Sequence, residues 1–227
     1  MQALVKKIQF TGSLRLLSGL HIGASNESVD IGGVDRLLVR RPDNGEPYIP
    51  GSSLKGKIRS LLEQTRGAAE VGDDTTVNDL FGNVNNKGKE NRASRLIVRD
   101  AYLTRESEQD LKQSKYTDYP YTEIKFENTI DRVKGTAGNP RKTERVPVGS
   151  VFQIKFVVNI WSDESEKSHI DLLREGLQLL EADYLGGSGS RGYGQVKIDI
   201  DLDAPEVLYN GQQYTDASVP TQTVPAQ

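Results

Sequence analysis

The spacing of apolar residues along the chain predicts four strands. Residues 5–16 place Ile8, Phe10, Leu14 and Leu16 on one face, as expected of a strand with one buried side. Residues 96–102 and 196–202 are shorter stretches rich in apolar and β-branched side chains. The strongest alternation lies between these two stretches, where every second residue from Phe152 to Ile160 is apolar.

A second spacing, of three and four residues, predicts two helices. After Ser52 and Ser53, either of which could serve as an N-cap, apolar residues follow at helical intervals: Leu54, Ile58, Leu61 and Leu62. The second set is Ile170, Leu173, Leu177 and Leu180. Each pattern gives an amphipathic helix with one face available for packing.

The order of these elements is β-α-β-β-α-β, which predicts an α+β, ferredoxin-like fold with both helices on one face of an antiparallel sheet. The other sheet face would be free. Two long insertions, residues 17–51 and 103–150, interrupt the order, and long insertions in a compact domain are often functional. We expect one domain over residues 1–203 and a loosely held tail over residues 204–227, which is poor in apolar residues.

Charge is distributed unevenly. The net charge is −3, but five acids and no Lys or Arg lie from Asp199 onward, so residues 1–198 sum to −3 + 5 = +2. Basic residues concentrate in segments 87–99 and 132–145. Such patches permit binding to a polyanion, although a solvated loop explains many charge runs.

The composition also excludes several classes of protein. The chain has no cysteine and two histidines, which excludes disulfides, thiolate catalysis and cysteine-based zinc sites. It has neither a signal sequence nor an apolar stretch of membrane-spanning length, so we expect a cytoplasmic protein without membrane contact.

Residues 185–194 form a glycine-rich segment, Leu-Gly-Gly-Ser-Gly-Ser-Arg-Gly-Tyr-Gly. It matches the G-x-G-x-x-G dinucleotide pattern, but that site requires a strand before the loop and a helix after it, and here the order is reversed. A tight connection between helix and strand is one interpretation. A contact with phosphate or base through Arg191 and Tyr193 is the other.

Residues 51–57 resemble a Walker A loop, except that Ile58 stands where Ser or Thr would bind magnesium. An NTPase is therefore disfavoured. Lys55 and Arg59, four residues apart on the expected exposed side of the helix, are candidates for docking a phosphate backbone. A solvated basic face is the alternative.

Three further segments carry candidate chemistry. His21 lies between turn glycines, where it is either a hydrogen-bonded structural residue or a donor to RNA. Asp35 follows two glycines, so it is either a turn residue or a carboxylate that holds a hydrated divalent ion against a phosphate. Residues 123–145 combine turn residues with basic ones, which is typical of a hairpin laid on a nucleic-acid strand or of an unbound surface hairpin.

Taken together, these motifs resemble one family, the RAMP backbone subunits of type III CRISPR effector complexes, and most closely the repeated backbone subunit of the type III-A (Csm) complex. The resemblance runs from about residue 5 to residue 200. The segments that carry it are Gly19–Gly23, Ile31–Asp35, Ile49–Arg59, Leu80–Gly82, Lys125–Arg132, Asn139–Arg141 with Glu144–Arg145, and the glycine-rich segment.

The resemblance implies an RRM-like palm with an inserted lid and a thumb hairpin, polymerised as a filament along a CRISPR RNA beside other type III subunits. Each thumb would flip a base pair out of the guide–target duplex, and the target RNA would be cut beside it. Asp35 matches the family's cleavage residue. It would place a divalent ion, Mg²⁺ or another, while the target's 2′-OH attacks and leaves a 2′,3′-cyclic phosphate.

The resemblance also implies two sets of RNA contacts. Guide RNA would be held by His21, Lys55, Arg59, Ser190, Arg191 and Tyr193, and the thumb contacts would come from Arg132, Lys134, Asn139 and Arg141. The chain departs from the type III-A pattern in a slightly longer thumb, residues 134–138, and in Arg36 after the aspartate. A III-D subunit and a non-catalytic RNA-binding protomer are therefore the alternatives.

Overall fold

The computed structural model describes residues 3–24, 34, 36–83, 92–162 and 165–211. Its main element is an antiparallel sheet built around β1 (Leu4–Leu16). β7 (Val151–Trp161) pairs with β1 along nearly its whole length, from Leu4 opposite Trp161 to Arg15 opposite Val151. β8 (Val196–Ile200) pairs with the C-terminal part of β1 on its other side. The alternation that predicted these strands is confirmed in β1 from Ile8 to Leu16 and in β7 from Phe152 to Ile160, where the even-numbered apolar residues are buried. In β8, Val196 is buried, whereas Ile198 and Ile200 are partly buried.

The predicted strand over residues 96–102 is divided in two. β3 (Leu96–Val98) and β4 (Ala101–Leu103) both pair with β7, and β2 (Tyr48–Ile49) pairs with β4. Val98 lies opposite Phe156 whereas Tyr102 lies opposite Gln153. The β7 side thus has one residue fewer between these pairs, which is the geometry of a β-bulge.

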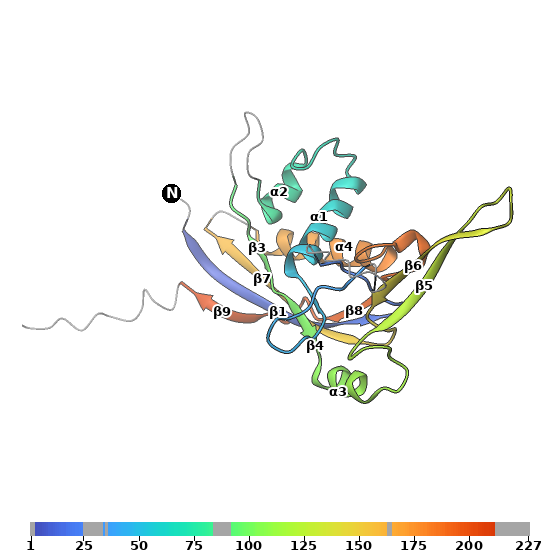
Figure 1. The fold of residues 1–227 in the computed structure, drawn as a ribbon. Helices are drawn as coiled ribbons and strands as arrows, with labels where there is room; N and C mark the ends of the chain where they lie inside the picture. Colours follow the sequence, from blue (N-terminus) through green and yellow to red (C-terminus); the bar gives the residue numbers. More distant parts are fainter. Residues whose placement is uncertain (1–2, 25–33, 35, 84–91, 163–164, 212–227) are drawn as a thin grey trace, which may run out of the picture.

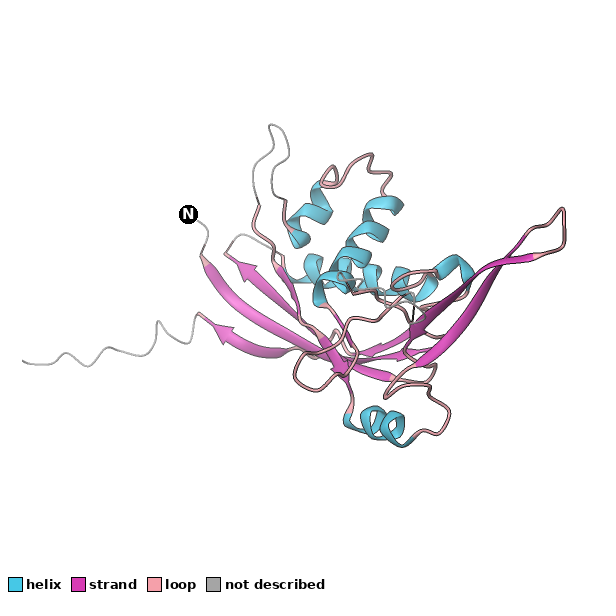
Figure 2. Ribbon diagram, in the orientation of Figure 1, coloured by secondary structure: helices cyan, strands magenta, loops and turns pink. Residues whose placement is uncertain are grey.

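Two helices cover one face of the sheet, as predicted (Figures 1 and 2). They are α1 (Gly51–Thr65) and α4 (Glu166–Ala182). Two shorter helices accompany them, α2 (Thr75–Phe81) and α3 (Arg105–Gln113). Capping of α1 by Ser52 or Ser53 was a wrong prediction. The helix begins at Gly51, whose N–H donates to Asp100 Oδ1 at 2.7 Å, so a carboxylate from the β3–β4 bulge satisfies the helix end.

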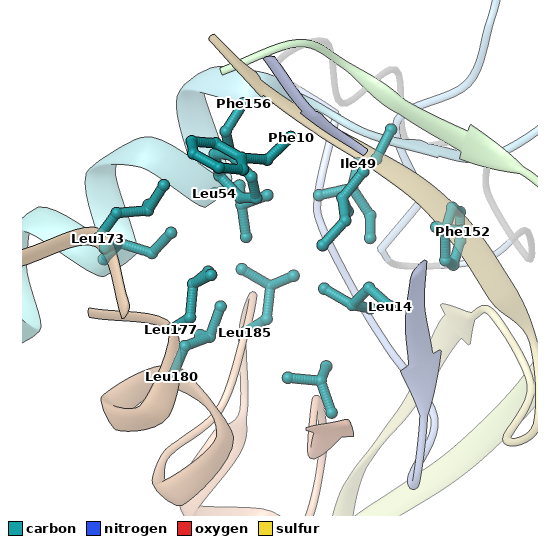
Figure 3. Close-up of a cluster of buried hydrophobic side chains, with 14 of the residues drawn as sticks. Phe10, Leu14, Ile49, Leu54, Phe152, Phe156, Leu173, Leu177, Leu180 and Leu185 are labelled. Carbon is teal, nitrogen blue, oxygen red and sulfur yellow. The ribbon is translucent and has the colours of Figure 1, made fainter. Parts of the chain in front are cut away.

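The core lies between the sheet and the helices α1 and α4. Phe10 and Phe156 from the sheet face Leu54 of α1, while Leu173 and Leu177 of α4 close the same cluster (Figure 3). All five side chains are buried, and burial of each apolar side chain stabilises the fold by about 1.5–3 kcal/mol. This core fixes the platform from which the loops and the hairpin project.

The loosely held tail was predicted to begin at residue 204, but an ordered strand follows that residue. β9 (Glu206–Asn210) pairs with Lys6–Gln9 of β1. The reason is that β1 is longer than β8, so the N-terminal half of its edge has backbone groups that need partners. Residues 212–227 of the predicted tail lie outside the described residues.

The second insertion contains a two-stranded hairpin, β5 (Glu123–Ile130) and β6 (Ala137–Arg145), that projects from the body of the protein (Figure 1). The hairpin predicted from residues 123–145 is thus confirmed. Among the described residues, no helix is long and apolar enough to span a membrane.

Candidate nucleic-acid interface

The glycine-rich segment packs against the loop that contains His21. The N–H of Gly187 donates to the carbonyl of His21 at 2.9 Å, and the N–H of Gly194 donates to the carbonyl of Gly19 at 3.0 Å. The segment turns through a short 3₁₀ helix, Gly189–Arg191. These bonds confirm that the two glycine-flanked motifs lie together.

Two of these glycines are required by the backbone. Gly186 and Gly194 have φ values of +76° and +71°, which side chains rarely adopt. A Cβ on Gly194 would overlap the carbonyl oxygen of Leu185, and one on Gly186 would overlap that of His21. Close backbone packing therefore accounts for part of the glycine content, as the structural interpretation of the segment expected.

His21 is held inside this packing. Its side chain is 7% exposed, and Nδ1 lies 2.7 Å from the backbone oxygen of Glu144. Because a carbonyl oxygen only accepts, Nδ1 carries the proton in this contact. The imidazole thus joins the loop to β6. The predicted contact with RNA would have to use the small part of the His21 side chain that is exposed.

The predicted contact between Tyr193 and RNA is wrong, because the side chain is 1% exposed. Its hydroxyl donates to Glu127 Oε1 at 2.8 Å. Lys125 Nζ lies 4.3 Å and the Arg145 guanidinium 5.0 Å from the ring centroid. Burial and the bond to Glu127 raise the pKa of Tyr193 to about 12. Tyr193 therefore ties the glycine-rich segment to the root of the hairpin.

The two neighbouring candidates, Ser190 and Arg191, are exposed. Arg191 Nη2 donates to Ser188 Oγ at 3.0 Å, so one guanidinium nitrogen is engaged at the surface. An exposed guanidinium with further N–H donors is chemically suited to bind a phosphate. These two residues fit the predicted RNA contact.

Lys55 and Arg59 were predicted on the exposed side of the helix, and this prediction is wrong. Lys55 Nζ donates to Ser94 Oγ at 2.6 Å and to the carbonyl of Leu96 at 2.8 Å. Burial, and secondarily the charge of Arg59, lower the pKa of Lys55. Arg59 donates to Glu63 and Asn78. Helical spacing could not reveal this, because the partners of Lys55 come from the strand region that packs beside the helix.

The hairpin presents the predicted thumb residues to solvent. Arg132, Lys134 and Arg141 are all exposed. Asn139 lies in β6, and its side chain is outside the described residues. The turn is fixed by Asp131, whose Oδ1 accepts the N–H groups of Val133 and Lys134. These two bonds hold the pKa of Asp131 below its ordinary value.

Apolar residues at the hairpin tip were missed by the sequence reasoning. Val133 is 94% exposed and Ile130 is 63% exposed, and Phe126 is also exposed further down β5. Their signal was available, because they are apolar residues within a segment that has no second apolar strand to bury them. Apolar side chains at the end of a cationic arm are suited to insertion between stacked bases.

Asp35 lies outside the described residues. The segment that follows it, from Arg36 to Arg40, is bonded to Glu144 of the hairpin. Glu144 N–H donates to the carbonyl of Arg36 at 3.1 Å, and Glu144 Oε2 accepts the N–H of Leu38 at 2.9 Å. Oε1 of the same buried carboxylate accepts from Arg40 and from Thr122. Glu144 thus anchors the chain that follows Asp35 to the root of the hairpin. Sequence reasoning assigned it no role.

The described residues do not build a metal site by themselves. No three His, Asp or Glu side chains converge among them, and the Glu144 carboxylate is already bonded on both oxygens.

Comparison with known families gives a consistent result. A model of the RAMP superfamily matches residues 13–197. The chain is 44% identical over 200 residues to a Streptococcus thermophilus protein named CRISPR system Cms endoribonuclease Csm3, covering 85% of this chain and 87% of that protein. A protein of the same name from Methanocaldococcus jannaschii is 43% identical, covering 91% of this chain and 85% of that protein.

Solved structures agree. A Csm3–Csm4 subcomplex of a type III-A CRISPR-Cas interference complex matches with a TM-score of 0.55 and 29% identity, covering 94% of each chain. Csm3 from Methanopyrus kandleri matches with a TM-score of 0.63 and 22% identity over 94% of this chain and 80% of that one. At that identity the second likeness shows the fold alone.

Proposed function

Because the chain belongs to the RAMP superfamily and, within it, to the Csm3 family of CRISPR endoribonucleases, we propose that it lies along a CRISPR RNA and cuts complementary target RNA. The observation that carries the proposal is the projecting hairpin. Its exposed cations and apolar tip are joined through Glu144 to the segment that follows Asp35. The base of the hairpin would thus hold two parts in a fixed arrangement, the hairpin that displaces a base and the Asp35 carboxylate.

In this proposal the sheet with α1 and α4 is the ferredoxin-like, RRM-like palm, the first insertion is the lid and the β5–β6 hairpin is the thumb. The order of strands β4, β7, β1 and β8 across the sheet supports the palm assignment. It is the order obtained when each helix crosses over one neighbouring strand. Ser190 and Arg191 would meet the guide backbone, and Arg132, Lys134 and Arg141 would hold the thumb on the duplex.

The chemistry proposed is attack of a target 2′-OH on the adjacent phosphate. The new P–O bond forms as the bond to the 5′-oxygen of the next nucleotide breaks, which leaves a 2′,3′-cyclic phosphate and a 5′-OH, and the proton lost by the 2′-OH is matched by the one gained at the 5′-oxygen. Such attack needs an in-line arrangement that a stacked duplex does not offer, and insertion of Val133 or Ile130 between bases would supply the distortion. Asp35, brought in by the segment anchored at Glu144, would act at the scissile phosphate. A bound Mg²⁺ or similar divalent ion would neutralise the developing charge there.

We further propose that copies of the chain assemble along the guide beside other type III subunits. The Csm3–Csm4 subcomplex among the similar structures supports the contact with another type III subunit. Each copy would then place one hairpin, and target cleavage would occur at regular intervals.

The test is Asp35→Ala in the assembled effector complex, with guide and target RNA and Mg²⁺. Target binding should persist while cleavage is lost, and Asp110→Ala on the exposed side of α3 is the matched control. Unchanged cleavage would exclude Asp35 as the catalytic carboxylate. Loss of binding together with cleavage would favour the second candidate, a structural RNA-binding protomer. Chelation of Mg²⁺ in the wild-type complex tests the metal separately.

A further inference from the structure

A cavity on the open face of the sheet is independent of the interface described above. Gln9 of β1 and Gln153 and Lys155 of β7 line it. These residues alternate with the buried Phe10 and Phe152, so they point to the sheet face opposite α1 and α4. Its other walls come from the β3–β4 bulge, β4 and the start of α3, and its volume is about 510 Å³. That volume is within the range of small-ligand sites, about 300–1,000 Å³.

The cavity is cationic, and the described part of the chain does not neutralise its cations. Arg99, Arg105 and Lys155 line it from three different elements, against the single carboxylate of Asp100. In the part of the chain that the structure describes, none of the three makes a side-chain hydrogen bond or ion pair. Asp100 is engaged at the end of α1 by the N–H of Gly51.

An aromatic ring completes the cavity. Tyr102 lies on its wall and is 42% exposed. The guanidinium of Arg41 lies 4.8 Å from the ring centroid, and the ring of Tyr48 lies 6.0 Å away. Arg41 is itself paired with Asp43 and Glu46, so it orients the ring without adding free charge to the site. Tyr102 thus packs against Arg41 and Tyr48 and keeps part of its ring exposed at the cavity.

We propose that this cavity binds single-stranded RNA, with phosphates at Arg99, Arg105 and Lys155 and one base on Tyr102. Cations distributed along a path, together with an exposed ring and amide side chains such as Gln153, are the combination that single-stranded nucleic acid requires. An acidic protein segment would use the cations but would gain little from the ring and the amides. The proposal goes beyond guide-directed cleavage and stands whether or not Asp35 is catalytic.

The experiment measures fluorescence anisotropy of a labelled oligouridine with the full-length protein. To separate the two surfaces, the hairpin variant R132A/K134A/R141A serves as background. Adding R99A/K155A should weaken the remaining affinity about tenfold or more and lower the salt slope by about 0.7 for each phosphate contact removed. The matched control adds K115A/K167A, two exposed lysines elsewhere, and should change neither value.

The ring is tested by Tyr102→Ala against Tyr102→Phe, which keeps the stacking surface. Loss of one stacked base should weaken binding about 5- to 100-fold in the alanine variant only. Photocrosslinking of 4-thiouridine RNA should also label the peptide that contains Tyr102. Unchanged melting temperatures confirm that each variant folds.

The proposal is overturned if the hairpin variant binds no RNA although its cavity is intact. That result would not contradict the proposed function, in which Ser190 and Arg191 contact the guide. The cavity proposal is overturned equally if the cavity and control variants lose the same affinity, or if an acidic peptide rather than RNA binds at the cavity. Conversely, loss of binding on mutating the cavity but not the hairpin would support this site and contradict the thumb assignment.

Discussion

The hydroxyl of Tyr193 donates a hydrogen bond to Glu127, 66 residues earlier in the chain, at 2.8 Å. The ring that carries this hydroxyl lies near Lys125 and Arg145 at the base of the hairpin. A residue that the sequence pointed to as an RNA contact is therefore part of the joint between the glycine-rich segment and the arm. Its mutation should alter where the arm sits more than how tightly guide RNA is held.

We therefore predict that Tyr193→Phe lowers the free energy of unfolding by about 1.5–3 kcal/mol, the usual contribution of a hydrogen bond to a charged group. In the assembled complex it should slow target cleavage and broaden the product lengths, with little change in guide affinity. Tyr116→Phe, at an exposed tyrosine, is the control. Product lengths identical to wild type would show that the hydroxyl does not position the hairpin.

The same residue predicts a pH dependence of stability. Tyr193 keeps its proton up to about pH 12 in the folded protein, whereas its ordinary pKa is 10.0. The unfolded chain loses that proton first, so the free energy of unfolding should fall between about pH 10 and 12 and level off above. Denaturant titrations of wild type and Tyr193→Phe across this range isolate the effect by difference. Parallel curves for the two proteins would contradict it.

Glu144 offers a test of the link between the Asp35 segment and the hairpin. Glu144→Gln keeps the shape but weakens the bonds from Arg40, Thr122 and Leu38, and hydrogen bonds to a charged group contribute about 1.5–3 kcal/mol each. We expect a loss of about 2–4 kcal/mol in the free energy of unfolding, measured by urea denaturation.

Cleavage in the Glu144→Gln complex should fall further than RNA binding does, because the change loosens the chain next to Asp35. Glu106→Gln on the exposed side of α3 provides the control. Full cleavage by a destabilised Glu144 variant would mean that the anchor has no part in placing Asp35.

Lys55 separates the sequence interpretation from the structural one. Since its ammonium is bonded to Ser94 and Leu96, Lys55→Met should lower the free energy of unfolding by about 1–3 kcal/mol. The folded fraction should retain its RNA affinity, measured by anisotropy at low temperature. A Lys55→Met variant with unchanged stability and weakened RNA binding would favour the sequence prediction that Lys55 binds the phosphate backbone.

Val133 tests the hairpin tip. Because it is 94% exposed, Val133→Ser should leave the melting temperature unchanged while reducing target cleavage about tenfold, if an apolar wedge is needed to unstack the bases. Val148→Ser, at another exposed valine, should leave both unchanged. Equal cleavage by the two variants would exclude Val133 as the wedge.

The sequence by itself determined the framework. Alternation along β1 and β7 and helical spacing in α1 and α4 are local properties of the chain, so they predicted the four-stranded order and both covering helices. The turn residues and basic density of residues 123–145 likewise predicted the hairpin, and the reversed context of the glycine-rich segment excluded a dinucleotide site.

Only the tertiary structure decided which polar groups are free. Lys55 and Tyr193 read as surface residues, but their partners, Leu96 and Glu127, are distant in sequence. The same holds for Asp100, which caps α1 from the β3–β4 bulge, and for Glu144, which anchors the chain after Asp35. Hydrogen bonds of this kind depend on packing between elements, and periodicity within one element carries no information about them.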